Sequence, residues 1–225
     1  VSIHARFVLI ITLILIILGS GMFLALEWSG SLEGMPVSMK LLNSLFQSVT
    51  CRTAGFNTVD VGTLRENTLF MMIGLMFVGG SPGSIAGGIK TTTIGVIALL
   101  VINMFRGKRE LTMWGRSVGR DVIERSATLV ILSFLFISFS TFMMITVSGF
   151  HGEHTFLSTL FEVTSAFGTV GLSTGMTPKT SPLGRLFMCI VMFVGRLGPL
   201  TLILAVSSRK RRAPVRYPEE NIMVG

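Results

Sequence analysis

Charged side chains are scarce in this sequence. Aspartate, glutamate, lysine and arginine make up 13% of its 225 residues, whereas about 25% is usual in soluble domains. Half of the residues are hydrophobic, and the mean hydropathy is +0.73. A disordered chain has the opposite composition, with few apolar residues and much charge. The composition therefore excludes disorder, argues against a soluble globule and predicts a folded protein of the lipid bilayer.

Residues that build catalytic and metal sites are also few. Cys51 and Cys189 give neither a disulfide framework nor the spacing of metal ligands. The three histidines, His4, His151 and His154, lie near or outside the expected membrane surface. A membrane-embedded enzyme would need a nucleophile and base, or a metal site, within its spans. We therefore expect no enzyme activity and no organic cofactor.

Long apolar runs dominate what is present. A transmembrane helix needs about 20 mostly apolar residues. The runs cover residues 7–26, 68–105, 127–148 and 182–206. The second run is too long for one straight span, and the sequence GGSPGSIAGG at 79–88 interrupts it. Two shorter stretches, 39–51 and 154–167, have about the length of re-entrant half-helices.

The formal net charge of +8 would suggest nucleic acid in a soluble protein, but here the basic residues gather at one side of the spans. They are Arg6, then Arg106, Lys108, Arg109, Arg116, Arg120 and Arg125, then Arg209, Lys210, Arg211, Arg212 and Arg216. Because cytoplasmic loops concentrate lysine and arginine, we expect a multi-pass protein with both ends cytoplasmic and no nucleic-acid partner. The cluster at 209–212 fits either a lipid-headgroup anchor or a docking site for an acidic partner.

An internal repeat organises the chain. TAGFNT at 53–58 and TVGLST at 169–174 lie 116 residues apart, and MFVG recurs at the same offset. Each copy would consist of a span, a half-helix, a Thr-x-Gly-x-x-Thr segment and a returning span. We expect an all-α polytopic membrane protein with two parallel repeats, 1–108 and 109–206, and a cytoplasmic tail at 207–225.

The Thr-x-Gly-x-x-Thr segments suit an ion pathway. Non-helical backbone at membrane depth must be buried in protein or face water, and glycine lets carbonyl groups turn inward as in a selectivity filter. The half-helices would direct partly negative carboxyl ends towards the pore, which favours a cation. The alternative is two ordinary glycine turns. Arg52 precedes the first segment, and we expect it to brace that segment from behind, with Glu162 as a candidate partner.

The interruption at 79–88 contains Gly79, Gly80, Ser81, Pro82, Gly83, Ser84, Ile85, Ala86, Gly87 and Gly88. Proline and repeated glycine do not continue a stable helix, so we expect a loop that obstructs or releases the pore. A kinked helix with closely packed glycines is an alternative. A phosphate loop is not supported, because Ile89 precedes Lys90 where the motif requires glycine. Arg196 occupies the position equivalent to Gly80, and we expect it beside this loop unless its role is only structural.

Four stretches resemble motifs of the Trk/Ktr/HKT superfamily of potassium transporters, and most closely its KtrB membrane subunits. They are VTCRTAGFNT at 49–58, GGSPGSIAGGIKTTT at 79–93, SAFGTVGLSTGMTP at 165–178 and MFVGRLGPLT at 192–201. The family fold has four span–pore-helix–span repeats around one pore. The two repeats here resemble the third and fourth, which implies half of a pseudo-fourfold pore whose remaining N-terminal repeats lie outside this chain.

The resemblance implies K⁺ uptake across the cytoplasmic membrane, with Na⁺ as an activating ion. It implies K⁺ ligands from the backbone oxygens of Thr53, Ala54, Gly55, Phe56, Thr169, Val170, Gly171 and Leu172, supported by Arg52, Asn57 and Glu162. It implies gating by the 79–88 loop and Arg196. The implied partners are a second copy of the subunit, a cytoplasmic nucleotide-binding ring and the lipid bilayer. The alternatives are a Na⁺-permeable pore or a non-conducting scaffold.

Overall fold

The computed structural model describes residues 2–107, 112–113, 116–148 and 156–198. Its helices are α1 (Ile3–Glu27), α2 (Val37–Thr50), α3 (Glu66–Phe77), α4 (Thr91–Phe105), α5 (Arg120–Ser148), α6 (Phe156–Gly168) and α7 (Pro182–Leu197), with 3₁₀ turns η1 (Val61–Thr63) and η2 (Thr177–Lys179). Two strands of two residues each, β1 (Thr112–Met113) and β2 (Arg116–Ser117), pair antiparallel before α5. The all-α membrane fold expected from the sequence is thus confirmed, with this minimal hairpin as an addition.

The apolar runs become helices of unequal length. Ile3–Glu27 and Arg120–Val147 are long and apolar enough to cross a membrane. The second run is divided between α3 and α4, two shorter apolar helices separated by a loop. The fourth run is helical to Leu197. Its last residues, the 207–225 tail with its basic cluster, and Lys108 and Arg109 lie outside the described residues.

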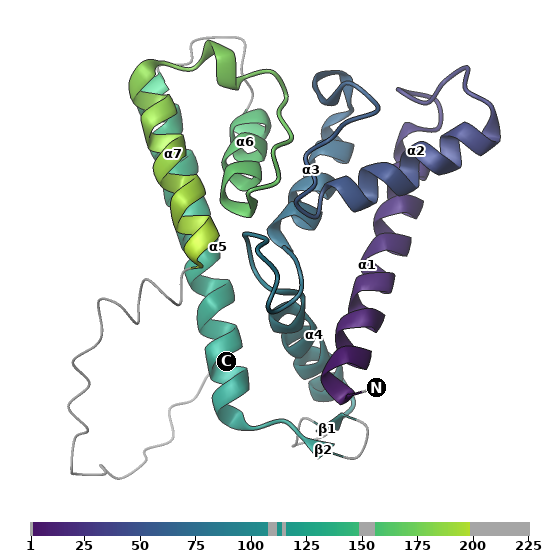
Figure 1. Cartoon of the computed structure of the whole chain (residues 1–225), viewed down its shortest axis with the longest axis vertical. Coiled ribbons are helices and arrows are strands. Elements are labelled where there is room, and N and C mark those ends of the chain that lie inside the picture. The colour runs from purple at the N-terminus through teal and green to yellow at the C-terminus, as the bar shows by residue number, and fades with distance from the viewer. Residues whose placement is uncertain (1, 108–111, 114–115, 149–155, 199–225) are drawn as a thin grey trace.

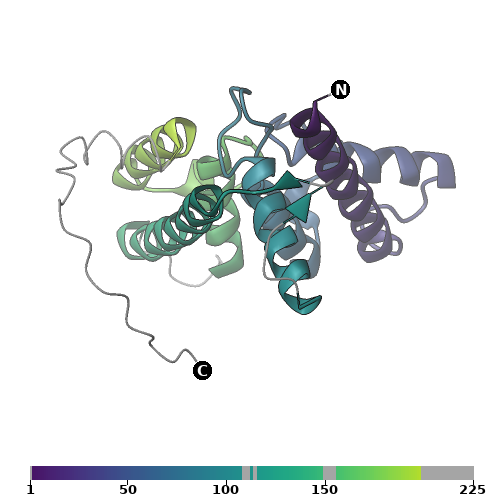
Figure 2. The ribbon, with the colours of Figure 1, turned by 90° about the horizontal axis from the view of Figure 1, so that it is seen from below.

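Both halves of the chain follow the same course. In Figure 1, α1 and α5 start at the lower end and rise, α2 and α6 lie in the upper half, and α3 and α7 return downward. Figure 2 shows the first half (α1 and α2) and the second half (α5 to α7) on opposite sides of α4. The halves meet where α3 packs against α6 and where α4 packs against α5. The boundary is therefore formed by α3 and α4 of the first half and by α5 and α6 of the second half.

A buried carboxylate ties the top of α1 to the start of α3. Glu27 has no exposed surface. Its oxygens accept hydrogen bonds from the Ser31 amide and hydroxyl, both at 3.0 Å, from the Arg65 amide at 3.1 Å and from the Thr68 hydroxyl at 2.5 Å. Buried charges are normally compensated in this way, and the bond from Arg65 also occupies the amide of the residue that caps the start of α3.

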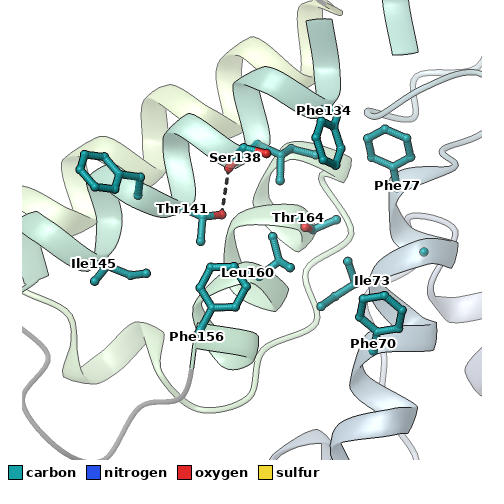
Figure 3. Close-up of a pocket in the computed structure, with 13 residues that line it drawn as sticks. Phe70, Ile73, Phe77, Phe134, Ser138, Thr141, Ile145, Phe156, Leu160 and Thr164 are labelled. Carbon is teal, nitrogen blue, oxygen red and sulfur yellow. Dashed lines mark hydrogen bonds between the residues drawn. The ribbon is translucent and has the colours of Figure 1, made fainter. Parts of the chain in front are cut away.

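A lateral cavity of about 680 Å³ lies between α3, α5 and α6 (Figure 3). Aromatic and aliphatic side chains line it, together with a few hydroxyl groups: Phe70, Ile73, Gly74, Phe77, Phe134, Ile137, Ser138, Thr141, Phe142, Ile145, Phe156, Leu160 and Thr164. None of these side chains carries a charge or a carboxamide. Because a bare cation requires several oxygen ligands in place of water, this cavity is not the candidate ion site.

Candidate ion pathway at two matched bends

The Thr-x-Gly-x-x-Thr segments, called here the first bend (53–58) and the second bend (169–174), follow directly after α2 and α6. Their first amide groups turn back to the helix ends. The amides of Ala54 and Gly55 donate to the Thr50 oxygen at 3.2 and 3.4 Å, and the Val170 amide donates to the Ser165 oxygen at 2.9 Å. These bonds satisfy carbonyl groups that a helix end leaves free, and they fix the backbone of each bend against its short helix.

The two bends share an uncommon backbone conformation. Thr53 and Thr169 have φ angles of 73° and 51°, and within the described residues they are the two non-glycine residues with positive φ. Gly55 and Gly171 follow two positions later with φ angles of 78° and 93°. A non-glycine residue in this region costs about 1–2 kcal/mol, and such strained residues cluster at functional sites. The sequence repeat is therefore also a repeat of backbone geometry.

The bends approach each other closely. A Cβ atom added at Gly55 would overlap the Val170 oxygen and lie 3.3 Å from the Gly171 Cα atom. A Cβ atom added at Gly171 would lie 3.5 Å from the Gly55 Cα atom, which is ordinary contact. The first glycine thus permits a backbone approach that no side chain would allow, whereas the second needs glycine mainly for its φ angle.

The carbonyl groups of each bend differ along its length. Those of Thr53, Ala54, Gly55, Thr169, Val170 and Gly171 accept no hydrogen bond from any residue that the structure describes. The next carbonyl in each bend accepts a hydrogen bond from a hydroxyl group of the preceding short helix. The Phe56 oxygen accepts from the Thr50 hydroxyl at 2.5 Å, and the Leu172 oxygen accepts from the Ser165 hydroxyl at 2.6 Å. Three consecutive carbonyl oxygens per bend are therefore without a hydrogen-bond donor among the described residues.

The expected pairing of Arg52 with Glu162 is not formed. The Glu162 carboxylate, 3% exposed, accepts hydrogen bonds from Ser173 Oγ, the amide and hydroxyl of Thr174 and Thr177 Oγ1 at 2.6–3.1 Å. It therefore stabilises the end of the second bend and the residues that follow it. Arg52 Nε and Nη1 are buried and have no hydrogen-bond partner among the described residues.

Asn57 makes a local contact. Its side-chain amide donates to the Val59 oxygen at 3.4 Å, two residues along the chain. This bond stays within the turn that leads away from the first bend. In the described part of the structure, Asn57 is thus a turn residue rather than a link to the other half.

The 79–88 segment is a loop closed at its base, and not a kinked continuous helix. Val78 and Ile89 form a parallel bridge. The Gly79 amide donates to the Ile89 oxygen at 2.8 Å, and the Ile89 amide donates to the Phe77 oxygen at 3.2 Å. These bonds bring the end of α3 and the approach to α4 side by side, so the intervening residues project as one unit between the two halves (Figure 1).

Two side chains hold this loop, although the sequence predicts no role for Lys90 and predicts one for Thr169 only through its backbone oxygen. Lys90 Nζ donates to the oxygens of Ser84 and Ala86 at 3.2 and 2.7 Å. The Gly87 amide donates to the Thr169 hydroxyl at 3.1 Å, which connects the loop to the second bend. Arg196 is exposed in the last turn of α7. Among the described residues it makes no hydrogen bond with the loop, and Lys90 makes these bonds instead.

The described residues thus form a helical protein with two short helices that end at matched, strained bends, beside an interrupted helix. The sequence profile described as "Cation transport protein" (TrkH) matches residues 3–212. The chain belongs to this family, which confirms the resemblance found in the motifs.

Individual relatives place it more closely. The Ktr system potassium uptake protein B of Bacillus subtilis (strain 168) is 38% identical over all of this chain and 50% of its own length. The potassium/sodium uptake protein NtpJ of Enterococcus hirae is 35% identical over all of this chain and 51% of its own length. The chain thus spans about half the length of the curated relatives it matches.

A solved structure agrees on the fold. The crystal structure of the potassium transporter TrkH from Vibrio parahaemolyticus superposes with a TM-score of 0.68, covering 91% of this chain and 44% of that one, at 18% identity. The helical membrane architecture is therefore that of the TrkH fold.

Proposed function

We propose that this chain is the C-terminal half of the ion-translocating subunit of a Ktr/Trk-type system, which takes up K⁺ through a pore in the cytoplasmic membrane. The observation that carries the proposal is the pair of matched bends. Each has a threonine and a glycine at positive φ, and each leaves three consecutive carbonyl oxygens without a donor among the described residues. Backbone oxygens in this arrangement can replace the hydration shell of an alkali cation.

Electrostatics support a monovalent cation. The first four positions of the two bends contain no carboxylate, so attraction comes from carbonyl dipoles and from the carboxyl ends of α2 and α6. Dipoles bind a monovalent ion weakly enough to release it, as conduction requires. A membrane potential, negative inside, adds about 2.3 kcal/mol per charge for each 100 mV in favour of cation uptake.

Two bends supply half of a ring. In this proposal residues 1–108 and 109–206 are two repeat units, and two further repeats of the same protein complete the filter. The 79–88 loop and Arg196 control passage below it, and both ends of the chain and the 207–225 tail are cytoplasmic. A second copy of the subunit and a cytoplasmic nucleotide-binding ring complete the system.

A Na⁺-permeable pore is the second candidate, because one relative is named a potassium/sodium uptake protein. Selectivity depends on the number and field strength of the oxygen ligands. Competition between the ions separates the candidates: Na⁺ in excess should leave K⁺ uptake unchanged in the first case and reduce it in the second.

The bends can be tested with three glycine substitutions in the full-length protein, expressed in cells that lack their own K⁺ uptake. We expect Gly55→Ala to reduce K⁺ uptake most, because its Cβ atom would overlap the Val170 oxygen. Gly171→Ala, with strain from φ alone, should reduce it about tenfold, the equivalent of the 1–2 kcal/mol that a side chain costs at positive φ. Uptake of ⁸⁶Rb⁺ or K⁺ by depleted cells measures both.

Gly34→Ala is the matched control. Gly34 has a φ of 75°, close to the 78° of Gly55, but a Cβ atom there would meet nothing within 4 Å. Strain alone would affect the Gly34 and Gly55 variants alike. Equal uptake by the Gly34 and Gly55 variants, at equal membrane expression, would show that the bends are not the filter.

A further inference from the structure

The side chain of Lys90, just after the 79–88 loop, stabilises the folded shape of that loop. The Lys90 ammonium group donates to two loop oxygens, those of Ser84 and Ala86, and an ammonium group has only donors to offer. The Ser84 amide and hydroxyl both return to the Ser81 oxygen, at 3.1 and 2.7 Å, and form the turn at the tip. With the bridge at its base, the loop is thus a preformed unit whose shape depends on Lys90.

The loop is also attached to the second bend and not to the first. Thr169 Oγ1 accepts the Gly87 amide, and a Cβ atom at Gly87 would lie only 2.8 Å from the Gly168 oxygen. Thr53 occupies the equivalent place in the first bend, with the same positive φ. Its hydroxyl has no contact with the loop among the hydrogen bonds of the described residues. The two copies therefore differ in this one attachment.

The surroundings of Lys90 favour a reversible contact. Its ammonium group binds neutral carbonyl oxygens rather than a carboxylate. Hydrogen bonds from a charged donor contribute more than neutral ones, but these two involve no opposite charge that would add an ion pair. The loop is thus held by a contact of limited strength, which suits a segment that has to move.

We propose that Lys90 and Thr169 are positioning residues that latch the 79–88 loop between the two halves of the pore. Lys90 keeps the loop folded, and Thr169 ties it to the second bend. Departure of the loop requires the Gly87–Thr169 bond to break, so the position of the loop and the state of that bend are coupled. The inference rests on the proposed role of this loop as the gate.

The experiment uses the full-length protein in liposomes, with a nitroxide spin label at Ile85→Cys in a Cys189→Ser background. Ile85 is 82% exposed near the tip of the loop, whereas Cys51, the other cysteine of this chain, is buried. We expect Lys90→Met to raise label mobility and to increase passive K⁺ efflux about tenfold, as the loss of charge-assisted hydrogen bonds implies. Lys179→Met removes one positive charge from an exposed turn and should change neither readout.

Thr169→Val should raise mobility and efflux about fivefold, since one neutral hydrogen bond is lost, and Thr169→Ser should restore the values of the starting protein. Thr53→Val is the control, because it removes the equivalent hydroxyl group from the first bend, which has no bond to the loop among the described residues. The mobility of the label should stay as low as in the starting protein. If Lys90→Met does not fold, the Thr169 and Thr53 variants still test the proposal.

An unchanged spectrum in both Lys90→Met and Thr169→Val would overturn the latch, as would equal mobility in Thr53→Val and Thr169→Val. Increased mobility together with no K⁺ flux in any variant would support the latch and contradict the proposed transport. The two failures are thus distinguishable.

Discussion

The two copies of the repeat share their backbone conformation at the bends and differ in the returning helix that follows each bend. After the first bend, α3 stops at Phe77 and gives way to the loop, whereas α7 continues through the equivalent residues to Leu197. The glycines of the repeated MFVG motif show the difference. A Cβ atom at Gly79 would overlap the Gly87 oxygen in the loop, but one at Gly195 would overlap the Phe167 oxygen at the end of α6. The same motif thus serves loop packing in one copy and helix packing in the other.

The largest expected effect is a loss of stability, and it should differ between substitutions of Gly195 and Gly79. Gly195→Ala should destabilise the full-length protein by about 3 kcal/mol or more, the upper range for overpacking, because its close neighbours are backbone atoms of Phe167. Gly79→Ala should cost less, since the loop can shift away without separating α6 from α7. Thermal unfolding of the purified variants in detergent measures both.

Gly74→Ala provides the control, because a Cβ atom at this position in α3 would meet nothing within 4 Å. Its unfolding temperature should equal or slightly exceed that of the unsubstituted protein, since alanine is the better helix former. A Gly79 variant less stable than the Gly195 variant would show that the loop, and not the α6–α7 contact, is the more rigid neighbour.

Much of this arrangement could be predicted from the sequence. The apolar runs predict the helices, and the proline and repeated glycines between Phe77 and Thr91 predict the loop, since proline together with several glycines does not continue a stable helix. The common offset of 116 residues correctly matched Thr53 with Thr169 and Gly55 with Gly171, which share their backbone conformation. These features are local, so they can be recognised without knowledge of which helices pack together.

Contacts between distant residues were harder to predict. A charge-based argument paired Arg52 with Glu162, but the nearest donors to that carboxylate are hydroxyl and amide groups eleven to fifteen positions later. Buried carboxylates are satisfied by hydrogen bonds as readily as by a cation. Lys90 was considered only as part of a failed phosphate motif, and its lack of any acidic neighbour in sequence gave no reason to assign it a partner.

A smaller effect is expected when either of the two buried carboxylates, Glu162 or Glu27, is neutralised. Glu162→Gln should lower stability by about 2 kcal/mol, the range for hydrogen bonds to a charged group, and should also reduce the preference for K⁺ over Na⁺, because Glu162 fixes the chain that leaves the second bend. Glu27→Gln should lower stability to a similar degree but leave the preference unchanged, because Glu27 holds the start of α3. Unfolding temperature and competitive uptake measure the two quantities.

Loss of ion preference in both carboxylate variants would mean that the filter responds to any loosening of the fold. Loss in the Glu27 variant alone would place the selective region nearer to α1 and α3. Either result would contradict a specific role for Glu162 at the second bend.

The smallest expected effect concerns the hydroxyl groups behind the bends. Thr50→Val and Ser165→Ala each remove a donor to the fourth carbonyl of a bend, Phe56 in one and Leu172 in the other. One neutral hydrogen bond is worth about 1 kcal/mol, so each variant should weaken K⁺ binding about fivefold, and by a similar factor because the two bonds are equivalent. Thr128→Val is the control, since its hydroxyl bonds within α5. A large effect in one bend and none in the other would show that the ion is bound by one copy of the repeat, and that the shared geometry is structural in the second.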